Sequence, residues 1–188
     1  PWRRRMPSGI LSGGELNERS PHMADIFLHL DGVNGGSTDR DHEDWIEVHS
    51  VSWGVDATTA ASPSRGAASV TGKARQLPLA LTAPTSIASP LLFAAVTETT
   101  RFRAAMIDVR RAGRERSQSV VRWNLRELTL NRLEIEASAD GVVDSFVLLA
   151  QRVELTAYRW ADDGGTTDIL SREWDFTSHG VRVTPPNG

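Results

Sequence analysis

The chain has 188 residues, of which 39% are hydrophobic and 24% charged, so it is long enough and apolar enough for one folded domain. Its formal net charge of -3 gives no general indication of a nucleic-acid or membrane-surface partner. The absence of cysteine excludes disulfides, thiolate nucleophiles and cysteine-based zinc sites. No apolar run approaches the roughly 20 residues needed to cross a bilayer, so we expect no membrane insertion.

Residues 1–22 differ from the rest of the chain. They include Arg3, Arg4 and Arg5 but lack the apolar centre of a secretory signal peptide. Because Met23 follows them, we expect a disordered leader or expression-derived extension over 1–22, one domain over 23–180 and a tail over 181–188. A basic arm that contacts nucleic acid or an acidic partner is the alternative interpretation.

Alternating residues predict two strands near the start of the domain. Apolar and polar residues alternate over 25–31, as is typical of a strand, and the Gly-rich segment 32–37 ends it with a turn. The pattern resumes over 45–53, although neither face of that segment is cleanly apolar. Such a strand buries one side in a barrel and presents the other to a partner or to water.

A long loop separates this strand from the next. Residues 57–72 are rich in Ala, Ser, Thr, Gly and Pro and have no periodic pattern, which predicts a functional or flexible loop. Alternation over 75–81 then predicts a strand, in which Pro78 indicates an edge or irregular position.

One short helix is expected. Ser89 is predicted to supply the N-cap hydroxyl and Pro90 the first helical residue, before an apolar segment that ends near Val96. A start one turn earlier, near Ser86, is the alternative.

After the helix the sequence is nearly all strand. On the longest of these strands, the apolar residues at 143, 147, 149, 153 and 155 are expected to share one face. About eight strands with regular turns and one side helix predict a mainly β fold, a barrel or a sandwich. The later strands are expected over 103–111, 120–137, 142–160 and 169–176.

No catalytic or metal-binding motif is found. The histidines, including His42 and His49, are interpreted as polar loop and strand residues, although they and nearby acids can in principle meet in space. A calcium loop that starts at Asp39 fails, because Asp44 stands where glycine is required and Ser50 where glutamate is required. No phosphate-binding loop or serine-hydrolase elbow occurs, and no feature selects an acidic pair for hydrolysis. We therefore expect no enzyme activity and no cofactor.

An arginine cluster lies at a predicted hairpin tip. It comprises Arg110, Arg111, Arg114 and Arg116 around Gly113. We interpret it as a solvated turn, and a grip on an acidic surface is the alternative.

Several short motifs follow one another along the chain. They comprise a first strand with a Gly-containing turn, a polar segment with His42, a strand ending in Ser52-Trp53-Gly54, a Ser89-Pro90 helix start and a closing Trp174-Asp175. In this order they resemble the haemolysin-coregulated proteins, the Hcp family of type VI secretion. The helix exit, Thr97-Glu98-Thr99-Thr100, departs from the glycine frequent in the family, so we expect another exit geometry. The leader has no family counterpart, and with 12 residues after Phe176 no fused effector enzyme is expected at the C-terminus. The residues that carry the resemblance are Phe27, Gly32, Gly35, His42, Trp53, Gly54, Ser89, Pro90, Trp174 and Asp175.

The resemblance implies a compact β-barrel of two sheets with one short side helix. It also implies a tube protein whose hexameric rings stack into the inner tube of a contractile apparatus. Its implied partners are further copies of itself, the spike protein at the tube tip, the sheath and baseplate, and secreted effectors in the lumen, which contribute to virulence and interbacterial competition. The implied location is the bacterial cytoplasm before firing, and then the exterior or a target cell.

We assign provisional roles to particular residues on this basis. Half-apolar segments over 45–53 and 142–160 are candidates for the ring interface, and small polar Ser50 and Ser52 are candidates to face the lumen. A monomeric β-barrel that binds a small ligand is the alternative function. The ring-stacking candidates are the residues Thr58, Thr59, Ser62, Pro63, Ser64, Arg65, Gly66 and Ser69 of the long loop.

Overall fold

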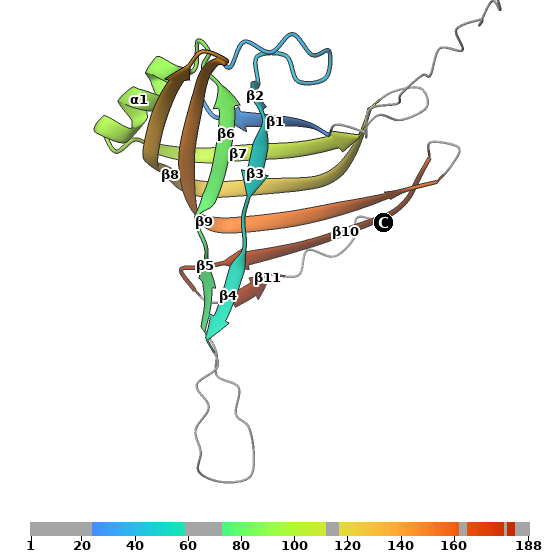
Figure 1. Cartoon of the computed structure of the whole chain (residues 1–188). Helices are drawn as coiled ribbons and strands as arrows, with labels where there is room; N and C mark the ends of the chain where they lie inside the picture. The colour runs from blue at the N-terminus through green and yellow to red at the C-terminus, as the bar shows by residue number, and fades with distance from the viewer. Residues whose placement is uncertain (1–23, 59–72, 112–116, 162–164, 179, 183–188) are drawn as a thin grey trace, which may run out of the picture.

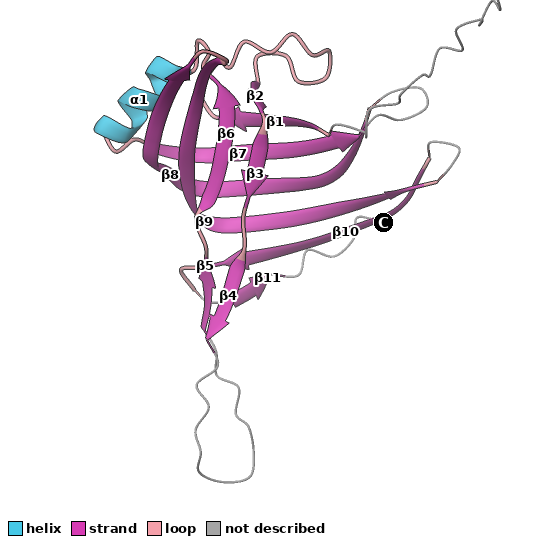
Figure 2. Cartoon of the chain, in the orientation of Figure 1, coloured by secondary structure: helices cyan, strands magenta, loops and turns pink. Residues whose placement is uncertain are grey.

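The computed structural model of the chain describes residues 24–58, 73–111, 117–161, 165–178 and 180–182 (Figure 1). The leader, most of the C-terminal tail and most of the predicted long loop lie outside these residues. The described part is nearly all strand, with one short helix, α1 (Ser89–Thr97) (Figure 2). The strands are β1 (Asp25–Leu30), β2 (Ile46–Val48), β3 (Ser50–Ser52), β4 (Val55–Thr58), β5 (Lys73–Gln76), β6 (Leu79–Pro84), β7 (Arg101–Arg111), β8 (Gln118–Ser138), β9 (Gly141–Trp160), β10 (Thr166–Asp175) and β11 (Gly180–Arg182).

Nine of the strands form one sheet that closes into a barrel. Strand β9 pairs with β8 along one edge, while its other edge pairs first with β6 and then with β10. On the far side, β7 pairs with β1 and β1 with β2, and β3 pairs with β6. Only His49 separates β2 from β3, and its N–H donates to the Thr82 carbonyl at 2.7 Å, so the chain itself completes the barrel. The predicted mainly β barrel with one side helix is confirmed.

Side chains fill the barrel, so it is a packed core. Leu28, Leu30, Leu79 and Leu148 are fully buried, and Phe146 is 1% exposed. Burial of this apolar surface at about 25 cal/mol per Å² is the main favourable term in folding.

Strands β4 and β5 form a separate two-stranded ribbon. The ribbon projects from the barrel beyond β3 and β6 (Figure 1). Val55 pairs with Gln76 and Thr58 with Lys73. The predicted long loop therefore begins as a strand at Ala57 and Thr58, which corrects its first two residues, while 59–72 lie outside the described residues.

The number of strands exceeds the expected eight because two predicted strands are interrupted and because β4 and β11 were not predicted. His49 divides the 45–53 segment into β2 and β3, and Leu77-Pro78 divides β5 from β6. Proline has no N–H for the ladder, so the break at Pro78 agrees with the irregular position predicted there. Eleven strands result within the described residues.

Three adjacent strands, β7, β8 and β9, bend at the same level. At this level, successive buried residues on each strand are separated by three positions in the sequence instead of the usual two. The pairs are Phe102 and Ala105, Leu125 and Leu128, and Ala150 and Val153. Glu127 lies at this level with a φ of 51°, a left-handed conformation that costs a non-glycine residue about 1–2 kcal/mol. The pairing register continues unchanged through the bend, so the strands turn together.

This bend separates the barrel from an extension that we call the arm: residues 118–126 of β8, 152–160 of β9, and β10. It also overturns the predicted apolar face of β9. The buried residues before the bend are Asp144, Phe146, Leu148 and Ala150, and Val153 is the first buried residue beyond it. The single period assumed for 143–155 was wrong because the bend shifts the alternation by one residue.

Helix α1 packs beside the barrel with Leu92 and Ala95 buried. The prediction that Ser89 caps this helix is wrong, because Ser89 is its first residue and the N-cap, Ala88, has no capping side chain. Pro90, predicted as the first helical residue, is the second and lies in the first turn. The Ser89 hydroxyl instead accepts the N–H of Ser86 at 2.9 Å and donates to the buried Asp144.

The exit of α1 also differs from expectation. Thr99 takes the left-handed conformation, with a φ of 53°, that glycine usually supplies at a helix end. The N–H of Thr99 donates to the Val96 carbonyl at 3.3 Å, and that of Thr100 to the Ala95 carbonyl at 2.9 Å. This is a Schellman motif, so the usual exit is kept with threonine in place of glycine.

Candidate functional site

The two faces of the arm differ in chemistry. On the face that continues the core, pairing brings Val121, Ala157 and Leu170 of the arm into one row with Val109 of the neighbouring strand β7. Leu170 is 58% exposed, and Leu155 in the neighbouring row is 38% exposed. The apolar face therefore extends beyond the barrel, where no described residue covers it.

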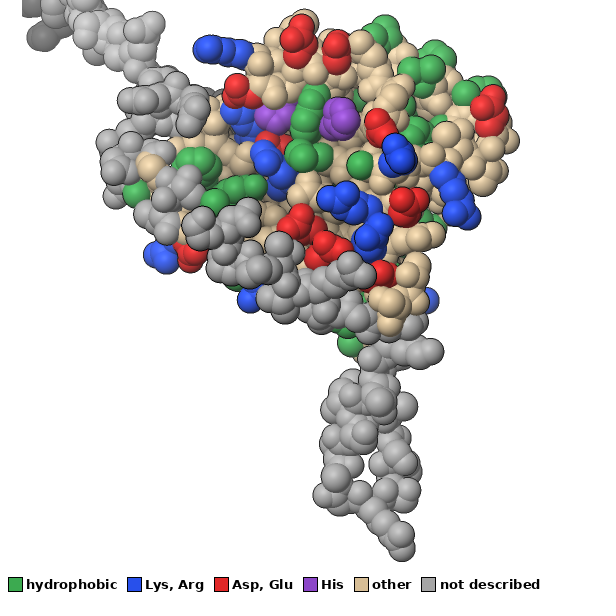
Figure 3. Space-filling view, turned by 180° about the vertical axis from the view of Figure 1, so that it is seen from behind, with side chains coloured by type: hydrophobic (Ala, Val, Ile, Leu, Met, Phe, Trp, Pro, Cys, Tyr) green, Lys and Arg blue, Asp and Glu red, His purple; other side chains and the backbone are tan. Residues whose placement is uncertain are grey.

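The opposite face of the arm is polar. Asp108, Arg122, Thr156 and Ser171 form one row across β7 to β10. In the next row, Glu154 accepts hydrogen bonds from Asn124 at 2.9 Å and from Ser171 at 2.6 Å. Figure 3 shows a face of the molecule on which arginine, acidic and histidine side chains lie close together.

The segment 34–45 folds back on itself, because backbone hydrogen bonds join its first residues to its last two, directly before β2. The N–H of Gly35 donates to the Asp44 carbonyl at 2.7 Å, and that of Ser37 to the Trp45 carbonyl at 3.1 Å. The segment brings His42 onto Phe27 of β1, with the two rings stacked at a centroid separation of 4.4 Å. Trp45 contacts the imidazole edge-on at 4.6 Å.

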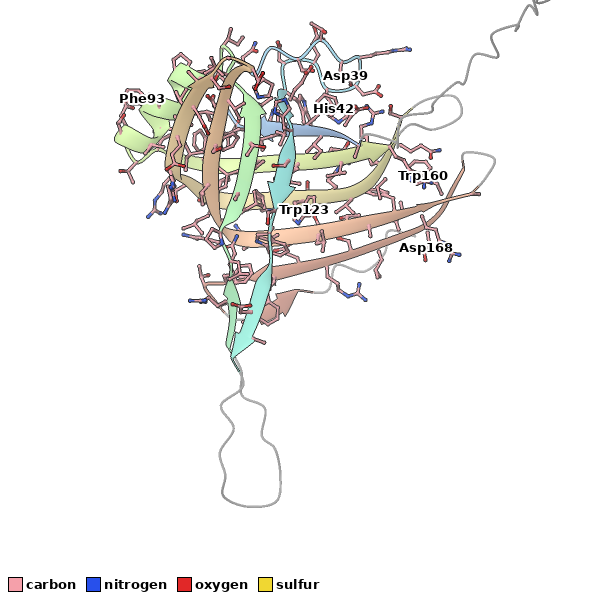
Figure 4. The ribbon with its side chains drawn as sticks, in the orientation of Figure 1. Asp39, His42, Phe93, Trp123, Trp160 and Asp168 are labelled. Atoms are coloured by element: carbon pink, nitrogen blue, oxygen red, sulfur yellow. The ribbon has the colours of Figure 1, made fainter. Side chains whose placement is uncertain are left out.

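His42 is the centre of a buried polar cluster and is 4% exposed. Its Nε2 lies 2.9 Å from Oδ2 of Asp108 on β7, a residue that is 1% exposed. Its Nδ1 lies 3.1 Å from Asp39 Oδ1 and 3.1 Å from Arg110 Nη1. The imidazole therefore links the 34–45 segment to the sheet; Figure 4 labels Asp39 and His42 on this segment.

Two arginines complete the cluster. Arg110, 5% exposed, donates to Asp41 at 2.8 Å and to the Ser117 carbonyl at 2.9 Å. Arg122 donates to Asp108 Oδ2 at 3.0 Å, and the Ser119 hydroxyl donates to the same oxygen at 2.9 Å. Buried charges are tolerated only when paired in this way.

The cluster shifts the pKa values of its acids. For Asp108, burial is the largest influence and opposes ionisation, but hydrogen bonds from Arg122 and Ser119, the Arg122 charge and His42 together hold its pKa below the ordinary 3.8. Burial likewise opposes ionisation of Asp39, and bonds from His42 and the Asp41 N–H, with the Arg110 charge, lower its pKa. The pKa of Arg122 is raised, because its bond to Asp108 outweighs burial. Both carboxylates are therefore charged at neutral pH.

Beside the cluster lies an open hollow of about 470 Å³. Its charged lining includes Asp41, Asp108 and Arg122, and its aromatic lining includes Tyr158 and Trp160 near the end of β9. Figure 4 labels Trp160 there. Among the described residues, no group of three or more His, Asp or Glu side chains is placed to hold a metal ion.

A second exposed apolar surface lies on α1 and the turn before it. Ile87, Leu91 and Phe93 are 65%, 46% and 61% exposed. In the figures, α1 and the free end of the arm lie at opposite ends of the molecule, and Figure 4 labels Phe93 on the helix.

The residues that carried the family resemblance do not form one site: they lie in the polar cluster, in turns, against the core and at the end of β10. Phe27 and His42 meet in the cluster, Gly32 forms the turn after β1 with a φ of 81°, and Trp53 packs against the core. Gly54 lies against Leu77, and Trp174 contacts Phe176 at the end of β10. Bonds from Thr177, chiefly its hydroxyl, and from Ser178 lower the pKa of Asp175 to about 2, so this carboxylate fixes the turn after β10.

The predicted assembly residues are not brought together with the cluster. Ser50 and Ser52 are exposed on β3, where the Ser50 hydroxyl lies 2.7 Å from that of Thr82. Their position in a lumen stays a prediction. Of the stacking candidates, Thr58 ends β4, and Thr59, Ser62, Pro63, Ser64, Arg65, Gly66 and Ser69 lie outside the described residues.

One interpretation from the sequence was wrong: Arg110 belongs to a buried ion-pair cluster and not to a solvated hairpin tip. His42 is a polar loop residue as interpreted, and the alternative that it meets nearby acids in space is also what the structure shows. Sequence reasoning also missed Asp108 and Arg122. The one available signal was a charged residue between Ile107 and Val109, which alternation alone assigns to an exposed face.

Comparison with solved structures identifies the fold. A structure described as a type six secretion system protein superimposes with a TM-score of 0.76 at 18% identity, covering 84% of this chain and 99% of its own. Hcp1 from Salmonella typhimurium superimposes with a TM-score of 0.68 at 21% identity, covering 85% of this chain and 99% of its own. Hcp2 from the same organism superimposes with a TM-score of 0.60 at 22% identity, covering 82% of this chain and 97% of its own. The fold is therefore that of the Hcp proteins.

The sequence itself gives the family. The family model described as "Type VI secretion system effector, Hcp" matches residues 27–160. The chain belongs to this Hcp family of type VI secretion, which confirms the resemblance read from its motifs. No curated protein sequence matches the chain, and no helix within its described residues is long and apolar enough to cross a membrane.

Proposed function

We propose that this protein is a structural subunit whose copies form hexameric rings, and that the rings stack into the tube of a type VI secretion system. The tube is expelled when the surrounding sheath contracts, with the spike at its tip and effectors in its lumen. The observation that carries the proposal is the arm, because its apolar face continues the core and is left exposed in the single chain. An exposed apolar surface of this kind is typical of a face covered by another protein.

Ring closure needs two different surfaces on each copy. A head-to-tail contact repeated by rotation closes into a ring when one patch meets a second, distinct patch on the next copy. The apolar face of the arm supplies the first patch. Closure also covers sheet edges that otherwise promote aggregation.

We expect Leu170→Asp to prevent ring formation. A charged residue in an interface that excludes water costs several kcal/mol unless it is paired, so lone protomers should replace rings in light scattering and in negative-stain images. The matched control is Ile169→Asp, because Ile169 is 54% exposed but pairs with Tyr158 on the polar face of the same strand. Rings that persist in Leu170→Asp, or that are lost equally in both variants, contradict the proposed interface.

The polar face of the arm suits a water-filled lumen. If the apolar face is covered by a neighbour, the polar rows across β7 to β10 remain available to line the channel. Ser50 and Ser52 on β3 remain the small polar candidates for the same role.

Stacking is assigned to the β4–β5 ribbon and the loop 59–72 beyond it. The ribbon projects away from the barrel, as an element that reaches the next ring must (Figure 1). Replacing 59–72 by Asn-Gly closes the ribbon with a two-residue turn, and we expect single rings but no tubes in negative-stain images. A Gly/Ser segment of the original length separates the effect of length from that of sequence; tubes that persist in the shortened chain rule out this role of the loop.

The alternative of a small-ligand carrier has less support. A carrier barrel needs an interior cavity, whereas side chains such as Leu28, Leu79 and Phe146 fill this one. The structural role therefore agrees better with the packed interior and the exposed arm.

A further inference from the structure

Asn34 and Gly35 form an Asn-Gly pair shortly after β1. In such a pair the backbone nitrogen of the glycine can attack the side-chain carbonyl carbon of the asparagine. The new C–N bond closes a five-membered imide, and ammonia leaves with the amide nitrogen and the proton of the glycine N–H. Water then opens the imide to aspartate or to isoaspartate, whose backbone runs through the side-chain carbons. Glycine favours the reaction because it has no Cβ to hinder the rotation that brings the two groups together.

The folded chain holds both reacting groups in place. The N–H of Gly35 donates to the Asp44 carbonyl at 2.7 Å, and Gly35 is buried although Asn34 is exposed. A Cβ at Gly35 would lie 2.3 Å from the Ile46 nitrogen, so the backbone has no room to rotate here. The Oδ1 of Asn34 accepts the N–H of Gly36 at 2.8 Å, which fixes the side chain. Because attack needs the two groups free to align, both hydrogen bonds must break before the imide can form.

Isoaspartate at this position does not fit the folded segment. It lengthens the backbone by one carbon, whereas the bonds that join the two ends of the segment 34–45, such as that from Gly35 to Asp44, require the ordinary spacing. The same segment carries His42 to its buried contact with Asp108. A chain modified in this way therefore cannot rebuild the buried cluster.

We propose that Asn34 is a modification site that folding closes. It deamidates when the segment 34–45 opens, and the isoaspartate that forms prevents the segment from closing again. The reaction needs only water, so the modification records that a chain has lost the structure around His42. It takes place on the single chain and does not require ring assembly, so its failure is distinguishable from a failure of the proposed function.

Peptide mapping by mass spectrometry after incubation in mildly alkaline buffer tests the proposal. Trypsin releases the fragment 20–40, in which Asn34 is the only amide side chain, and the second Asn-Gly pair falls on the separate fragment 183–188. We expect Asn34 in the folded chain to react at least about a hundredfold more slowly than in urea or in a synthetic peptide of the same fragment. A folded chain that reacts as fast as the peptide, or no reaction in urea, overturns the proposal.

Asp108→Asn connects the rate to the segment. It removes the carboxylate that contacts His42, so the open form is more populated, and we expect Asn34 to react about tenfold faster than in the wild type. Asp41→Asn is the matched control, because the Asp41 side chain is 54% exposed, and it should change the rate by less than about twofold. Equal rates in the wild type and in Asp108→Asn mean that the segment does not control the reaction.

Refolding tests the consequence of the modification. Asn34→Asp keeps the backbone length and the oxygen that accepts the N–H of Gly36, so it should refold as the wild type does. Chains that carry isoaspartate should refold with unprotected amides over residues 35–48 in hydrogen exchange. Equal protection in the two products contradicts the proposed block on closing.

Discussion

Gly35→Ala is expected to lower the free energy of unfolding by about 3 kcal/mol or more, the upper range for overpacking. A Cβ at this position would lie 2.3 Å from the Ile46 nitrogen and 2.3 Å from the Trp45 carbonyl carbon. Both are backbone atoms at the start of β2, so the strand itself must move. Since the Gly35 N–H also bonds to the Asp44 carbonyl, the displacement should spread to the segment that carries Asp39 and His42.

Urea unfolding measures this effect, with Gly32→Ala as the control. Gly32 has a φ of +81°, but a Cβ there meets no atom within 4 Å. Its cost is therefore only the left-handed backbone term of about 1–2 kcal/mol. Hydrogen exchange should show faster opening of residues 35–48 in Gly35→Ala alone. If Gly32→Ala is as destabilising as Gly35→Ala, close packing at Gly35 is not the cause.

The sequence predicted the strands well because most of them alternate against one core. The helix was also predictable, since Pro90 and the apolar residues after it mark a helix start. Alternation predicted the wrong buried face beyond the bend of the sheet. The bend was not predictable, because glutamate at position 127 does not indicate a left-handed backbone in the middle of a strand. The surrounding structure, and not the residue type, determines such a backbone conformation.

The charged cluster was beyond prediction for a different reason. His42 and Asp108 are 66 residues apart and meet only because the 34–45 segment lies against β1 and β7. From one sequence, any distant acid is an equally good partner for a histidine. The motif glycine Gly35 was found, but its role, to let the segment approach β2, needs the coordinates of Trp45 and Ile46.

Asp108→Asn is expected to lower the free energy of unfolding at pH 7 by about 3 kcal/mol, because it removes one partner of a buried ion pair. The carboxylate accepts bonds from His42, Ser119 and Arg122, which together outweigh burial and hold its pKa below the ordinary 3.8. A pKa that is lower in the folded chain means that the charged form favours folding. The stabilisation by the Asp108 carboxylate is therefore complete above its pKa in the unfolded chain. It is lost as the pH falls from that pKa through the lower pKa of the folded chain.

Urea unfolding of both proteins from pH 7 to below pH 3.8 tests this sign, since the gap between wild type and Asp108→Asn should narrow only in the acid part of that range. Asp41→Asn is the matched control, because Asp41 also binds an arginine of the cluster but its side chain is 54% exposed. Solvent screening limits that pair to about 1 kcal/mol or less. A gap that is constant with pH, or as small for Asp108 as for Asp41, means that the buried carboxylate does not hold the 34–45 segment to the sheet through its charge.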